Sequence, residues 1–147
     1  MPKAKKQHKR FKKFWIRTKL LEADVLVCVG SRKQFNKYFN SVFGEDGIHE
    51  DENFVGIVFE YSPPDIIGHF YVVWVESLDQ GLDDYGTLAH EVTHLVDRIF
   101  ETHNIPAGLE STELRASCSA FFQSQILAEY SKTKQLSINK KWGIHDE

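Results

Sequence analysis

Residues 88–96 constrain the fold of this chain more than any other stretch, because they must form a helix with one buried and one polar face. The stretch contains the pattern H-E-x-x-H, with His90 and His94 four residues apart. On an α-helix, such residues lie one above the other on the same face. Apart from Glu91, the positions between and beside them are uncharged, as in a helix that packs into a core. Both imidazoles can therefore point at one ion, with Glu91 about 100° further round the helix.

Two histidines and a glutamate at this spacing are the residue types that a zinc hydrolase requires. Imidazole nitrogens bind zinc, and a carboxylate beside the metal can take a proton from a water molecule bound there. Catalytic zinc usually has three protein ligands and one open position for water. We therefore expect His90 and His94 to be metal ligands, Glu91 to be the general base, and a third ligand to follow downstream.

The third ligand is expected on a second helix. Pro106 and Gly108 end the first helix, and a new helical pattern begins near Ser111, with Ser111 or Thr112 as its expected N-cap. Two antiparallel helices joined by a short loop face one another, so an acid in the first turn of the second helix can approach the histidines. Glu113 and Glu110 are the candidates. We prefer Glu113, which lies inside the helix next to small residues, whereas Glu110 suits the positive end of the helix.

Two acids are candidates for supporting roles around the metal. Asp97 follows His94 by three residues and lies on the same helix face as His90, so it could orient a ligand histidine. An ordinary polar position near the helix end is the equal alternative. Glu110 is the second supporting candidate if Glu113 binds the metal.

The pattern Leu88-Ala89-His90-Glu91-x-x-His94, followed by Gly108 and then by Thr112-Glu113-Leu114-Arg115-Ala116, resembles the gluzincin branch of zinc metallopeptidases. More narrowly, the stretch from about residue 15 to residue 127 resembles small zincin-like proteins that phages and prophages encode. The resemblance implies a phage-encoded enzyme that hydrolyses peptide bonds with one Zn²⁺ per chain. It assigns the zinc ligands to His90, His94 and Glu113 and the general base to Glu91. It also implies a sheet edge beside the metal that can pair with an extended peptide.

The rest of the pattern predicts an α+β fold, which for this resemblance is a minimal zincin-like domain. Strands are expected at residues 25–29, 54–60 and 69–76, and a helix capped by Ser31 at residues 31–42. Asp83 or Asp84 suits the N-cap of the H-E-x-x-H helix. The prediction is thus a small mixed sheet of about three strands, followed by the active-site helix and the ligand helix.

Charge is distributed unevenly along the 147 residues. Nine of the 18 Lys and Arg residues lie among the first 21 positions, which contain no acid. We predict a basic, flexible tail at residues 1–19, a metallopeptidase domain at 20–130 and a polar C-terminal tail at 131–147. The basic tail also supports an alternative function, that of a non-catalytic zinc-binding or nucleic-acid- or virion-binding module.

The two cysteines, Cys28 and Cys118, form no C-x-x-C pair, which favours a reducing compartment. The basic N-terminus is not followed by a secretory apolar region, and no stretch is long enough to span a membrane. We therefore expect a cytoplasmic protein that is not secreted by a signal of its own, and the resemblance to phage-encoded proteins implies a bacterial host and allows virion association. Its expected partner is a peptide or protein substrate, with no membrane contact.

Overall fold

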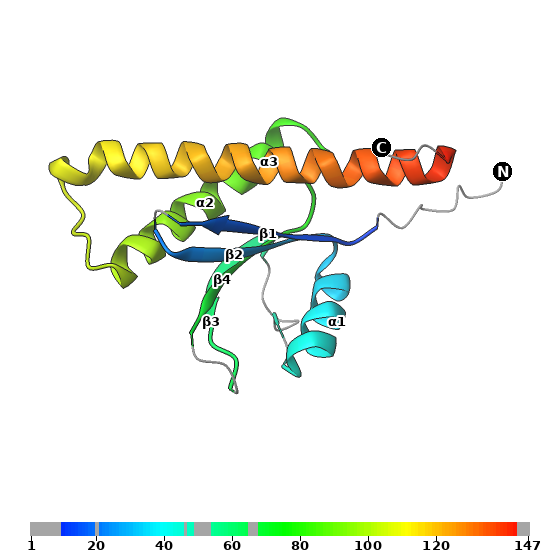
Figure 1. Ribbon diagram of the computed structural model, residues 1–147, viewed down its shortest axis with the longest axis horizontal. Coiled ribbons are helices and arrows are strands. Elements are labelled where there is room, and N and C mark those ends of the chain that lie inside the picture. Colours follow the sequence, from blue (N-terminus) through cyan, green and yellow to red (C-terminus); the bar gives the residue numbers. More distant parts are fainter. Residues whose placement is uncertain (1–9, 20, 46, 49–53, 65–67, 144–147) are drawn as a thin grey trace.

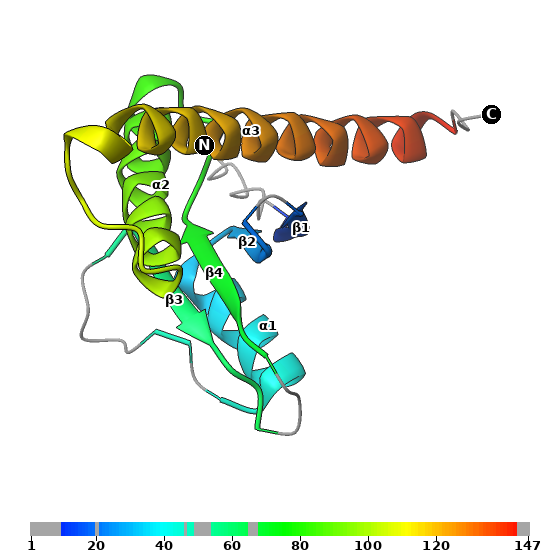
Figure 2. The same cartoon turned by 60° about the vertical axis from the view of Figure 1, so that its left-hand side comes forward.

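The computed structural model describes residues 10–143 except 20, 46, 49–53 and 65–67, and the outermost parts of both predicted tails lie outside this range. The described chain forms a four-stranded sheet between two helical layers. Figures 1 and 2 show α1 on one side of the sheet and α2 and α3 on the other. The elements are β1 (Lys12–Thr18), β2 (Ala23–Val29), α1 (Arg32–Phe43), β3 (Gly56–Tyr61), β4 (Phe70–Val75), α2 (Leu82–Thr102), a short 3₁₀ turn (Leu109–Ser111) and α3 (Thr112–Trp142).

The strand order is β1-β2-β4-β3. The central strands β2 and β4 run parallel, whereas β1 and β3 pair antiparallel on the two edges. Both central strands are almost continuously apolar, because side chains on both of their faces are covered by helices. The mixed sheet confirms the predicted α+β class.

The first strand, β1, was not predicted from the sequence. β1 pairs with β2 along its whole length and carries the buried Ile16 and the half-buried Phe14 on alternate positions. The prediction of a flexible tail at residues 1–19 is therefore wrong for residues 12–18, and the sheet has four strands where about three were expected. Lys13 and Arg17 occupy exposed positions of β1, and the half-buried Lys12 begins the strand on the face of Phe14 and Ile16. These three cations gave the stretch the appearance of a charge run.

The helices on the second face also differ from prediction at their ends. Gly81 is the N-cap of α2, while Asp83 and Asp84 lie inside the first turn, where their charge suits the positive helix end. The predicted caps are therefore wrong. α3 continues to Trp142, well past the expected boundary at residue 131, because Tyr130 is buried against the core and keeps the helix on the sheet. Within the described residues, no helix has both the length and the apolar character needed to cross a membrane.

Trp74 links the sheet to the layer formed by α1. Its side chain is fully buried, and its indole Nε1 donates a hydrogen bond of 2.9 Å to the carbonyl oxygen of Gly30. We expect Trp74→Phe to lower the free energy of unfolding by about 1–3 kcal/mol, because a buried carbonyl loses its donor. Urea denaturation would measure this loss. Trp15→Phe is the control, because Trp15 is 40% exposed and should cost less; equal losses would contradict the prediction.

Candidate metal centre

His90 and His94 lie together on the exposed face of α2. The opposite face packs into the core through apolar side chains spaced three and four residues apart, which fixes how the helix is turned. The two Nε2 atoms are 3.1 Å apart, and the rings meet edge to face with centroids 4.7 Å apart. Two nitrogens bound to one tetrahedral zinc ion are separated by about 3.3 Å, given zinc–nitrogen bonds of about 2.0–2.1 Å. The pair therefore suits two positions of a zinc site, although the distance also allows a hydrogen bond between the rings.

Glu91 points from the same helix towards the sheet. Its side chain is only 6% exposed, and burial raises the pKa of its carboxyl group, while the nearby His90 and His94 act in the opposite direction. The close neighbour is Gly56 at the start of β3. A Cβ atom at Gly56 would lie 2.9 Å from Cγ and 3.2 Å from Oε1 of Glu91. The absence of a side chain at Gly56 therefore makes room for the predicted base.

An open cleft lies between β3 and α2. Its wall contains both histidines and Glu91 on the helix side, and the side chain of Arg98 lies one turn beyond His94. The full lining, including the adjoining hollow, is Phe54, Val55, Gly56, Ile57, Val58, Gly86, Thr87, His90, Glu91, His94 and Arg98. Because β3 is the last strand of the sheet on this side, the cleft runs beside an edge that an extended peptide can join.

The structure does not bring the predicted third ligand to the histidine pair. Glu113 is exposed in the first turn of α3, and Glu110 is exposed in the 3₁₀ turn before it. Among the described residues, no three His, Cys, Asp or Glu side chains are grouped so as to hold a metal ion. Two of the three expected ligands are thus together, and the assignment of Glu113 stays a prediction.

Asp97 has a partner that the sequence analysis did not identify. Its carboxylate forms an ion pair with Arg115 of α3, and it makes no hydrogen bond with either histidine. The Arg115 guanidinium also lies over the ring of Phe100, 4.6 Å from its centroid. These contacts attach the beginning of α3 to the helix that carries the histidines, and a role for Asp97 beside a ligand histidine stays a prediction.

The cleft also contains residues that the sequence analysis did not select. Gly56 and Gly86 both border it, and Phe54 and Val55 expose about half of their side chains there. A glycine within an apolar strand was the available signal, since it often marks a close approach of another group. The arrangement can bind a cation through two imidazoles, move a proton at a buried carboxylate and hold an extended chain. No protein-family model, curated protein or solved structure matches this chain.

Proposed function

We propose that this chain is a zinc-dependent peptidase in which His90, His94 and Glu113 hold the metal. The observation that carries the proposal is the separation of 3.1 Å between the two imidazole Nε2 atoms, beside a buried carboxylate. The position of β3 at the edge of the described sheet, along the same cleft, supports a peptide as the substrate, because backbone hydrogen bonds can hold an added strand without reading its sequence. The resemblance to gluzincins supports the same function.

In this proposal, a zinc ion held by His90, His94 and Glu113 would supply Lewis-acid chemistry: it would lower the pKa of a water molecule towards about 7 and polarise the scissile carbonyl group. The carboxylate of Glu91 takes the proton of the attacking water and passes it to the leaving amine. Burial of Glu91 raises its pKa, which favours a base that must both accept and release a proton. Arg98 lines the cleft near His94, and its guanidinium is our candidate to stabilise the negative oxygen of the intermediate.

Metal content tests the proposal directly. We expect the purified protein to contain about one zinc ion per chain. His94→Ala should contain none, because it lacks one of the three side chains that make up the proposed site, two neutral imidazoles and one carboxylate. Elemental mass spectrometry would measure both. His69→Ala is the matched control, since His69 is exposed just before β4 and contacts Tyr71. A wild-type protein that takes up no zinc, or a His94→Ala variant that keeps it, would contradict the proposal.

The third ligand can be tested separately. The side chain of Glu113 is exposed, so it can change rotamer without leaving a packed position. We expect Glu113→Gln to weaken zinc binding by more than about 100-fold, because even the outer partners of metal ligands contribute about 10–100-fold. Glu110→Gln should change the affinity little. Titration against a zinc chelator would compare them, and equal effects would remove Glu113 from the site.

A further inference from the structure

A concave surface lies between the start of β1 and the C-terminal half of α3, and we call it the β1–α3 groove. Its lining contains four cations and no acid, together with two apolar side chains and a threonine. These residues are Arg10, Phe11, Lys12, Lys13, Thr133, Leu136 and Lys140. One of the cations, Lys13, lies at the rim, where its ammonium contacts the Tyr38 ring of α1. Leu136 is 57% exposed and adds apolar surface to the groove. A concave surface of this kind, cationic and partly apolar, suits an anionic ligand with apolar parts.

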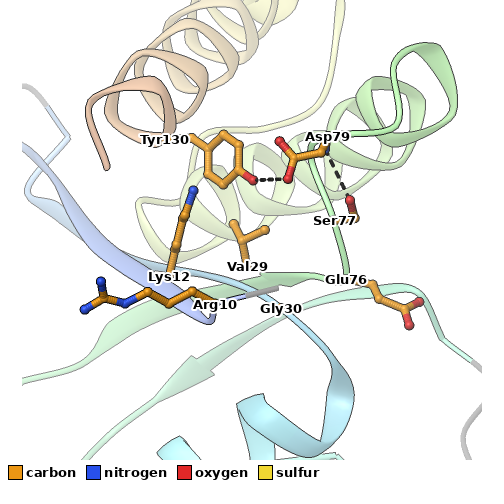
Figure 3. Close-up of a pocket in the computed structure, with 8 residues that line it drawn as sticks. All are labelled: Arg10, Lys12, Val29, Gly30, Glu76, Ser77, Asp79 and Tyr130. Carbon is orange, nitrogen blue, oxygen red and sulfur yellow. Dashed lines mark hydrogen bonds between the residues drawn. The ribbon is translucent and has the colours of Figure 1, made fainter. Parts of the chain in front are cut away.

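In the pocket that adjoins the groove, several cations lie close to one another. Figure 3 shows Tyr130 donating a hydrogen bond to Asp79, at 2.8 Å, with Lys12 beside the Tyr130 ring. The Lys12 ammonium lies 4.5 Å from the ring centroid, and Lys134 forms an ion pair with Asp79. Burial lowers the pKa of Lys12, and the charges of Lys134 and Arg10 lower it further, although Asp79 acts in the opposite direction. An added anion would relieve the repulsion between these cations.

We propose that the β1–α3 groove binds the phosphate backbone of a single-stranded nucleic acid. Lys and Arg side chains along a groove follow such a backbone, and adjacent apolar or aromatic side chains contact the bases. The volume of the groove, about 370 Å³, admits a part of one strand. The chain as a whole is acidic, with a net charge of −3. A polyanion is therefore repelled by most of the protein and attracted to this basic surface.

The groove is separate from the metal centre. β1 and β3 are the two opposite edges of the sheet, and the groove lies at β1 whereas the histidines lie beside β3. The binding site is also more than the basic tail of the sequence, because Lys140 comes from α3 at the other end of the chain. The inference therefore holds independently of the proposed peptidase activity.

Fluorescence anisotropy with labelled oligo-dT and oligo-rU tests the proposal on the full chain. We expect Arg10→Gln/Lys13→Gln/Lys140→Gln to weaken binding at least tenfold at about 50 mM salt and to reduce the salt slope by about 2, since each phosphate contact contributes about 0.7 on a single strand. All three side chains are exposed, so the fold should persist. The matched control is Arg17→Gln/Lys33→Gln/Lys37→Gln, which removes the same charge from exposed positions elsewhere and should change affinity less than about threefold.

A third variant separates the groove from the tail by replacing Lys3, Lys5, Lys6 and Lys9 with Gln. Loss of binding in this variant alone, with the groove variant unaffected, would overturn the proposal. Equal losses in the groove and control variants would also overturn it, as would a wild-type protein that binds neither oligonucleotide. Tighter binding of a duplex of the same length would contradict the assignment to single strands.

Discussion

Glu91→Gln is expected to lower peptide hydrolysis by about 10²–10⁴-fold, the usual contribution of a positioned general base. The substitution keeps the size and shape of a side chain that is only 6% exposed, but removes its ability to accept a proton. The measurement is kcat/KM on a peptide selected from a mixed library by mass spectrometry of the cleavage products. Zinc content should stay at the wild-type level, because the histidines are untouched. Unchanged activity in this variant would exclude the proposed mechanism.

The same variant separates catalysis from stability. Burial raises the pKa of Glu91 above its ordinary value of 4.5, so the folded protein binds this proton more tightly than the unfolded chain does. The contribution of Glu91 to stability is therefore largest below pH 4.5 and decreases as the pH rises through the folded-state pKa. In the zinc-free protein at pH 7, we expect Glu91→Gln to raise the free energy of unfolding by about 0.5–2 kcal/mol. An inactive variant that is also more stable cannot owe its inactivity to unfolding.

Much of the fold could be predicted because local pattern and tertiary environment agree. The apolar run at residues 25–29 became the central strand β2, and Ser31 caps α1 through reciprocal hydrogen bonds with Gln34. β1 was missed because its exposed face is basic and its buried face contributes few apolar residues. The continuation of α3 past residue 130 was missed because most of that stretch is polar, and packing of one face is enough to hold it.

The candidate site could also be predicted only in part from the sequence. The proximity of His90 and His94 follows from helix geometry alone, so the spacing of the sequence predicted it correctly. The position of Glu113 depends on how α3 is set against α2. The Arg115–Asp97 ion pair and the loop before α3 connect the two helices there, and neither leaves a periodic signal in the sequence. The position of β3 and Gly56 beside the cleft depends on the order of the strands, which the sequence does not show.

Gly56→Val is expected to damage the site from the sheet side. A Cβ atom at this position would lie 2.9 Å from Cγ of Glu91 and 3.2 Å from the carbonyl oxygen of Trp74. That carbonyl belongs to β4 and cannot move readily, so the Glu91 side chain must be displaced. We expect kcat to decrease by about 100-fold, the effect of a misplacement of about 1 Å in a catalytic group. The free energy of unfolding should decrease by about 1–3 kcal/mol from overpacking, as urea denaturation would measure.

Gly86→Ala is the matched control, because Gly86 borders the same cleft from α2 but a Cβ atom there meets nothing within 4 Å. An alanine inside the helix should add about 0.5–1 kcal/mol of stability. Its methyl group does not approach Glu91, so kcat should be retained. Any effect on activity should be a higher KM, because the methyl group narrows the cleft for the substrate. Zinc content should be unchanged in both variants. If Gly56→Val kept full activity, or if both glycine variants lost kcat to the same extent, Glu91 would not depend on the space that Gly56 leaves.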